Sequence, residues 1–168
     1  MKPMKSAAVL LTAAVLVSPG IADADTPAPQ AGAACGEDLA DAMTQLPDGS
    51  AFLVCQGPPD GSHTWAPAPV PFDPSDKWFS YGSGITLHGQ GFRNPNLTSG
   101  SWTATPLDPD TICGAEQVTV VSAGVLAAPQ SSQGEPGQSL SVDILPKLFT
   151  VTMTGDCLWS RDQTLFGW

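Results

Sequence analysis

The stretch SYGSGITLHGQGF, residues 80–92, places Ser83 and His88 among four glycines. With Asp73 or Asp76 upstream, these residues supply the side-chain types of a nucleophilic triad. However, a strand between Ser83 and His88 would separate them by about 16 Å at ~3.3 Å per residue and direct them to opposite faces. The sequence therefore does not favour a serine hydrolase, and its glycines suit turns, bulges or close backbone approach.

Other catalytic patterns are equally weak. Residues 89–91 lack the third glycine and the following helix of a phosphate-binding loop, and the chain has no Walker or G-x-S-x-G motif. The paired carboxylates Asp73/Asp76 and Asp108/Asp110 stand beside prolines, where aspartate typically forms turns. We therefore assign no catalytic residue from the sequence.

Aromatic side chains are the better candidates for ligand contact. Trp65, Trp78 and Tyr81 lie in or beside the proline-rich segment 63–79, and His88 follows them. Such rings can form an exposed apolar or sugar-stacking surface, although a place in the core is the more frequent role of buried aromatics. We keep these four residues as ligand-binding candidates.

The N-terminus has the pattern of a secretory signal peptide over residues 1–24. A short basic stretch precedes the apolar residues 6–17, and a small-x-small ending closes at Ala24. The apolar run is too short to anchor the mature chain across a bilayer. We expect a secreted or cell-envelope protein with a flexible Pro/Ala linker over 25–34 and one domain over 35–168.

Charge limits the partners of this chain. Its net charge is −10, and the cations that remain after cleavage are Lys77, Arg93, Lys147 and Arg161. Four cations scattered along the sequence cannot track a phosphate backbone, so nucleic acid is not an expected partner. The same count disfavours anionic membrane surfaces.

The four cysteines of an exported chain predict two disulfides. Three connectivities are open, and we favour Cys35–Cys55 with Cys113–Cys157 because each pair brackets a compact run of predicted structure. No C-x-x-C pair is present and neither histidine stands at ligand spacing from a cysteine, so we expect no metal site and no cofactor.

The predicted elements are mostly strands. Leu39, Met43 and Leu46 recur at helical spacing and predict one short helix over 37–46. Strands are predicted over 50–56, 84–88, 100–105, 116–127, 139–145 and 148–154. The last is expected to turn Phe149, Val151 and Met153 inward.

The connections are predicted from proline, glycine and polar residues. Pro146-Lys147 suggests a tight antiparallel connection between the last two strands, and 129–138 is expected to be a flexible polar loop. The prolines of 63–79 argue against regular structure there. Together these features predict an antiparallel β-sandwich or partly open barrel with one short N-terminal helix.

Several stretches resemble a known group of sequences. DPSDKWFSYGSGITLHGQGFRNPNL, SGSWTATPLDP, AEQ and LFTVTMTGDCLWSR are similar to short exported mycobacterial proteins of uncharacterised function, over roughly residues 35–165. The last stretch also resembles actinobacterial secreted β-domains in which a late cysteine, here Cys157, is followed by a tryptophan, here Trp159. The resemblance implies secretion and disulfides, and it brings no catalytic residues.

We therefore expect a secreted or cell-envelope binding protein without enzymatic activity, whose ligand is a protein, a glycan or a lipid. The alternative is an envelope-polymer hydrolase that uses Asp73 or Asp76 with His63 or His88. A third reading is a structural or antigenic secreted protein with no specific ligand. A concave or flat patch that holds Trp65, Trp78 and Tyr81 would favour binding, and a histidine that meets a carboxylate in a cleft would favour hydrolysis.

Overall fold

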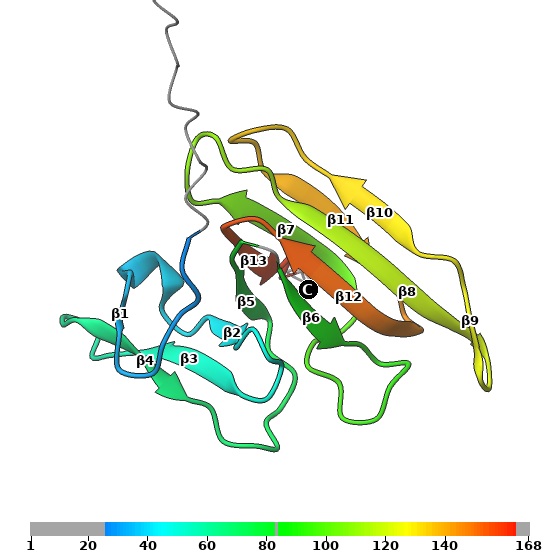
Figure 1. The fold of residues 1–168 in the computed structure, drawn as a ribbon, viewed down its shortest axis with the longest axis horizontal. Coiled ribbons are helices and arrows are strands. Elements are labelled where there is room, and N and C mark those ends of the chain that lie inside the picture. Colours follow the sequence, from blue (N-terminus) through cyan, green and yellow to red (C-terminus); the bar gives the residue numbers. More distant parts are fainter. Residues whose placement is uncertain (1–25, 83, 164–168) are drawn as a thin grey trace, which may run out of the picture.

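The computed structural model describes residues 26–82 and 84–163 and contains two β-sheets (Figure 1). The predicted signal peptide over 1–24 and Ser83 lie outside the described residues. Sheet A contains β1 (Ala34–Cys35), β2 (Met43–Gln45), β3 (Phe52–Gln56), β4 (His63–Pro67), β5 (Lys77–Ser80), β7 (Gly100–Pro106), β11 (Leu140–Ile144) and β13 (Cys157–Arg161). Sheet B contains β6 (Ile85–His88), β8 (Gly114–Ser122), β9 (Val125–Leu126), β10 (Gln130–Gln133) and β12 (Leu148–Thr154).

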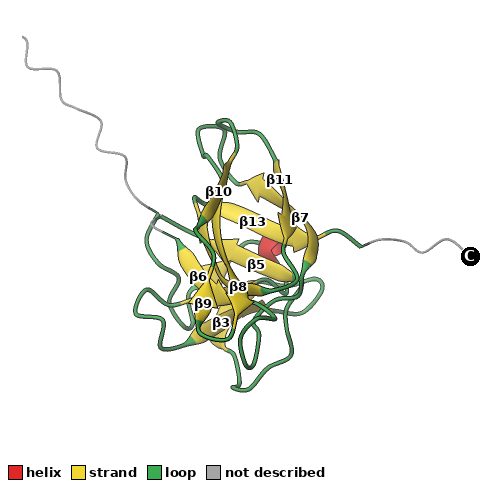
Figure 2. Cartoon of the chain, turned by 90° about the vertical axis from the view of Figure 1, so that its right-hand side faces the viewer, coloured by secondary structure: helices red, strands yellow, loops and turns green. Residues whose placement is uncertain are grey.

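The predicted mainly β fold is confirmed, and it takes the form of two packed sheets. Sheet A runs in the order β1-β4-β3-β2-β5-β13-β7-β11 and curls into a half-barrel. Sheet B runs β10-β8-β12-β6, and β9 pairs with β8. Figure 1 shows β6, β12 and β8 in front of β5, β13 and β7, and Figure 2 shows the sandwich from the side. Among the described strands, β2 with β5 is the one parallel pair, and the other pairs are antiparallel.

The helix predicted over 37–46 is wrong. Only a single 3-10 turn, η1 (Glu37–Leu39), forms there, and the chain then enters β2. Asp41 adopts a left-handed φ of 64°, which ends any helix, and its N–H donates to Cys55 O at 2.9 Å. Pairing with β3 therefore supplies the backbone hydrogen bonds that a helix would have formed within itself.

The tight antiparallel connection predicted at Pro146-Lys147 is also wrong. β11 pairs with β7 in sheet A, whereas β12 pairs with β8 and β6 in sheet B. The turn therefore carries the chain from one sheet to the other. The Gln117 side chain ties the two layers beside this turn, because it donates to Asp143 O at 3.0 Å and accepts from Leu145 N–H at 3.2 Å.

Strands also form where the sequence predicted none. β4 and β5 lie in the proline-rich segment, and β10 lies in the predicted polar loop 129–138. β10 has the sequence QSSQ and is held by backbone pairing to β8. The predicted strand over 116–127 divides into β8 and β9, which meet at Gly124 with φ 74°.

The predicted linker 25–34 lies against the domain along its described part. Residues 26–33 form no strand, but Pro29 is buried and Gly32 N–H donates to Trp65 O at 2.7 Å. The Thr26 hydroxyl donates to the Asp156 carboxylate. Ala34 already belongs to β1, so the first strand begins inside the predicted linker.

The core lies between the two sheets and contains three fully buried tryptophans. Trp78, Trp102 and Trp159 each donate their indole N–H, to Ser75 O, Thr98 O and Ser80 Oγ respectively. Buried indoles need such acceptors.

Two disulfides join distant parts of sheet A and the adjoining turns. The structure pairs Cys35 with Cys55 and Cys113 with Cys157, the connectivity favoured by the sequence. The first bond links β1 to β3, and the second links the residue before β8 to the start of β13. The second bond therefore connects sheet B to sheet A.

Candidate functional site

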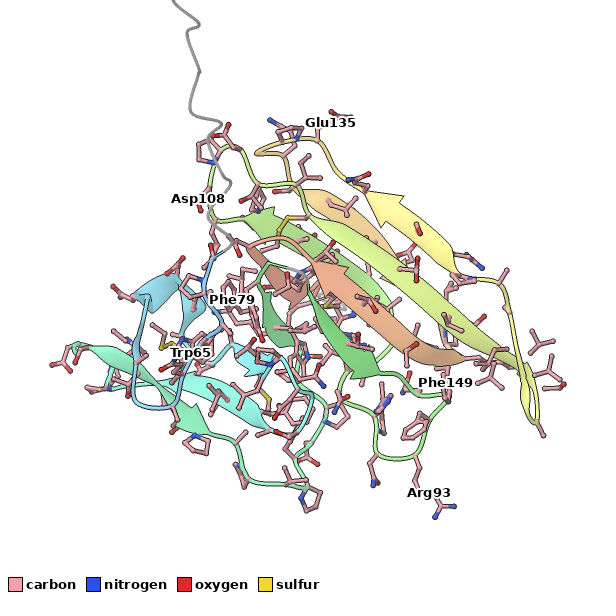
Figure 3. All side chains as sticks on the ribbon, in the orientation of Figure 1. Trp65, Phe79, Arg93, Asp108, Glu135 and Phe149 are labelled. Atoms are coloured by element: carbon pink, nitrogen blue, oxygen red, sulfur yellow. A yellow bond between two sulfur atoms is a disulfide. The ribbon has the colours of Figure 1, made fainter. Side chains whose placement is uncertain are left out.

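Three of the four predicted ligand contacts belong to the core. Trp65 and Tyr81 are 4% and 5% exposed, and Trp78 is fully buried. Trp65 stacks on Phe79 with ring centroids 5.9 Å apart, and Tyr81 donates its hydroxyl to Gln45 O at 2.6 Å. Figure 3 shows Trp65 and Phe79 inside the curl of sheet A. Trp78 and Tyr81 are therefore core residues, whereas Trp65 and Phe79 line a cavity of about 390 Å³ beside residues 26–30, and contact of these rings with a ligand stays a prediction.

The residues of the hydrolase alternative do not meet in the described chain. His63 is buried in β4, and His88 ends β6 in the other sheet. Asp76 pairs with Arg161 at 3.5 Å. Within residues 26–82 and 84–163, neither histidine has a carboxylate oxygen within 4.0 Å.

His88 instead anchors an aromatic cluster with Phe92 and Phe149. The rings of His88 and Phe92 stack with centroids 4.1 Å apart, and Phe92 meets Phe149 edge-on at 5.3 Å. Phe92 keeps 41% of its surface exposed. Phe149 was expected to point into the core, but a register shift between Leu148 and Thr150 leaves it half-buried against Phe92.

The loop that carries Phe92 is held by hydrogen bonds at both ends. His88 N–H donates to Asn96 Oδ1 and Asn96 N–H donates to His88 O, both at 2.8 Å. Gly91 N–H donates to Leu148 O at 2.7 Å, and a Cβ at Gly91 would lie 2.7 Å from Lys147 O. Only glycine fits there, so the loop is seated directly on the start of β12.

Next to this cluster, the outward face of sheet B is polar. Thr86 and Thr152 share a hydrogen bond at 3.0 Å, and Ser131 Oγ donates to Glu116 Oε2 at 3.4 Å. Further along the same strands lies an open cavity of about 290 Å³ lined by Gly114, Ala115, Glu116, Ser131, Ser132, Gln133, Thr152 and Thr154. Hydroxyl, carboxylate and amide groups converge here, but no aromatic ring lines this cavity.

Charge is distributed unevenly over the sandwich. Lys77 Nζ donates to Ala40 O at 2.6 Å, and Arg161 pairs with Asp76. Arg93 and Lys147 have no carboxylate oxygen within 4.0 Å in the part of the chain that the structure describes. Figure 3 shows Arg93 beside the Phe149 end of the sandwich, whereas Asp108 and Glu135 lie at the opposite end.

Sequence spacing alone could not reveal this site. Phe92 lies in the glycine-rich stretch first considered for catalysis, but its contact with Phe149 depends on how the loop folds onto β12. Arg93 and Lys147 are far apart in sequence, and the loop of Arg93 reaches Lys147 because the backbone of Gly91 packs on the start of β12. A signal was nevertheless present, because 84–107 and 144–155 each contain one basic residue and no acidic residue.

No family model, curated protein or solved structure matches the chain. The similarity to exported mycobacterial proteins therefore stays a prediction. Over the described ranges, no helix has the length and apolar character needed to cross a membrane. The same residues contain no group of three or more histidine, cysteine or acidic side chains arranged to hold a metal ion.

Proposed function

We propose that this chain is a secreted or cell-envelope protein that binds its ligand without chemical transformation, through the end of the sandwich that carries Phe92. One observation carries the proposal. Phe92 is a large, exposed aromatic ring on a loop fixed by hydrogen bonds, packed on one side against His88 and Phe149. Rigid aromatic anchors of this kind are typical of binding hot spots, because little side-chain entropy remains to be lost.

Two disulfides support an extracellular or envelope location. Disulfides persist in oxidising compartments, and all four cysteines of the sequence are bonded. The signal-peptide pattern of residues 1–24 also supports export. An envelope ligand is therefore the natural class to test first.

The hydrolase alternative has no supporting contact among the described residues. It would require a histidine and a carboxylate within hydrogen-bond reach of one another or of a shared substrate atom. His63 and His88 lie in different sheets, and Asp76 is engaged by Arg161. The binding proposal rests instead on the observed contacts of Phe92 with His88 and Phe149.

The test is binding of the chain from Asp25 onward to fractionated envelope material, separated into lipid, polysaccharide and protein. We expect one fraction to bind, and Phe92→Ala to weaken that binding by tenfold or more, about 1.4 kcal/mol at a hot spot. The matched control is Val70→Ala, an exposed apolar residue between β4 and β5. Equal loss in both variants, or no binding to any fraction, would overturn the proposal.

A further inference from the structure

We propose that the Phe92 end of the sandwich docks on the surface of an anionic lipid bilayer, because the local charge of this end differs from the whole-chain charge that disfavours such a surface. This inference rests on the proposed function and names its partner. The docking surface, here called the basic–apolar end, consists of Phe92, Arg93, Val121, Val125, Leu126 and Lys147.

Lys147 connects the two halves of this surface. Val120 N–H donates to Lys147 O at 2.8 Å, which places Lys147 beside the β8–β9 hairpin. On its other side the backbone of Gly91 packs so closely that an added Cβ would lie 2.7 Å from the same oxygen. The hairpin and the loop of Arg93 therefore both contact the backbone at Lys147.

The basic–apolar end gathers most of the exposed apolar side chains. Six large apolar residues are exposed in the described chain, and four of them lie here. Val121, Val125 and Leu126 are 61%, 50% and 47% exposed on the hairpin, and Phe92 is exposed on the neighbouring loop. Clustered exposed apolar side chains of this kind mark interaction surfaces, whereas scattered ones need no explanation.

The charge of this end is opposite to that of the whole chain. The net charge is −10, yet 84–107, 117–134 and 144–155 contain no acidic residue and only two basic ones, Arg93 and Lys147. Two carboxylates stand near these cations: Asp73 lines a cavity of about 400 Å³ with Asn94 and Pro95 beside the loop, and the exposed Asp143 precedes Lys147 by four residues. The end therefore favours an anionic partner.

Acidic residues collect at the far end of the same sheet. They are Asp108 and Asp110 before β8, Glu135 after β10, and Asp156 after β12. β8 has nine residues and so separates the two ends by roughly 27 Å at ~3.3 Å per residue. This is about three Debye lengths at physiological salt, so the far carboxylates are screened from a surface that touches the basic–apolar end.

The shape of the end favours a bilayer over a folded partner. Phe92 lies on the loop after β6 and the three hairpin side chains lie in β8 and β9; all four are exposed, and none of them lines the cavities at Gly114, Asp73, Trp65 or Gly100. Protruding apolar tips flanked by cations can enter the headgroup layer of a fluid membrane, where the cations meet lipid phosphates. A rigid protein would need a matching concavity to bury the same tips.

The experiment is vesicle co-sedimentation with the chain from Asp25 onward, which omits the apolar residues 6–17. Vesicles of phosphatidylcholine are compared with vesicles of phosphatidylcholine and phosphatidylglycerol in equal parts. We expect binding to the anionic vesicles only, weakened by salt. Arg93→Gln with Lys147→Gln should lower the partition coefficient about 25-fold, since each surface cation contributes about fivefold.

Two further variants complete the test. Val125→Ser with Leu126→Ser should weaken vesicle binding without changing its salt dependence, because it removes apolar contact only. The control Arg161→Gln removes a cation elsewhere on the chain and should leave binding unchanged. Equal binding to neutral vesicles, or no loss in the Arg93/Lys147 variant, would overturn the inference. Binding to an envelope polysaccharide or protein fraction that needs Phe92, without vesicle binding, would overturn it and leave the proposed function standing.

Discussion

His88 and Asn96 hold one another through two backbone-directed hydrogen bonds, from His88 N–H to Asn96 Oδ1 and from Asn96 N–H to His88 O, both at 2.8 Å. Asn96 O also accepts from Ser75 N–H at 2.9 Å. A single buried asparagine therefore fixes the loop that presents Phe92 and Arg93, and it ties that loop to the chain before β5.

Asn96→Ala should loosen this loop. The change leaves the His88 N–H without its acceptor, and we expect a loss of about 1–3 kcal/mol in the free energy of unfolding. Gln90→Ala is the matched control, because Gln90 Oε1 also accepts from a backbone N–H in the loop, that of Ser99, but at an exposed position. Denaturant unfolding of both variants checks this, and equal effects would contradict the role given to Asn96.

The titration of Tyr81 offers a direct measurement of burial. Burial raises the pKa of Tyr81 above its usual 10.0, and the negative charge of Asp48 raises it further. Because the folded pKa is raised, this contribution to stability is complete below pH 10 and is lost as the pH rises through the folded pKa.

Tyr81 is the sole tyrosine of the sequence, so phenolate absorbance reports this residue alone. We expect its midpoint above 10.0 in the folded protein and near 10.0 in denaturant. Asp48→Asn should lower the folded midpoint without abolishing the shift, since burial is the larger cause. The same midpoint in both solvents would show that the ring is not buried.

Two buried hydroxyls should respond differently to removal. Ser80 Oγ accepts from Trp159 Nε1 at 2.8 Å and donates to Gly155 O at 2.6 Å, whereas Thr98 Oγ1 is buried without a partner among residues 26–82 and 84–163. Ser80→Ala should cost about 1–3 kcal/mol because it strands the indole N–H, and Thr98→Val should be nearly neutral. Thermal and denaturant unfolding measure the free energy of unfolding of both variants. A larger loss for Thr98→Val than for Ser80→Ala would contradict these roles of the two hydroxyls.

Many of the strands could be predicted from the sequence, because apolar and polar residues alternate clearly in β11 and β12. β10 could not be predicted, since QSSQ has no apolar residue and its order comes from pairing with β8. Three apolar residues at helical spacing were too short a pattern to distinguish η1 and β2 from a helix.

The candidate site was harder to predict than the fold. The tryptophans of the proline-rich segment were visible in the sequence, but the curl of sheet A decides that Trp65 and Trp78 are buried. Phe92 belongs to the candidate binding site because it contacts Phe149 and His88, and these contacts depend on the path of the loop. Such relations are set by tertiary pairing and leave no local periodicity.

The disulfides should contribute unequally to stability. The bonds close loops of 20 and 44 residues, which corresponds to about 3 and 4 kcal/mol in the chain-entropy model. The paired change Cys113→Ser with Cys157→Ser should therefore lower the free energy of unfolding more than Cys35→Ser with Cys55→Ser. Unfolding by denaturant tests the order, and mass spectrometry of non-reduced peptides tests the pairing; mixed pairs would contradict the structure.

The most direct test of the account is to map which amides of the isotope-labelled chain from Asp25 onward respond to anionic lipid bicelles in NMR spectra. We expect the perturbed amides to cluster in 89–95, 120–127 and 146–149, the segments that form the basic–apolar end. Neutral bicelles should leave these signals unchanged. Perturbations centred on 108–112 and 135–138, at the acidic end, would contradict the account.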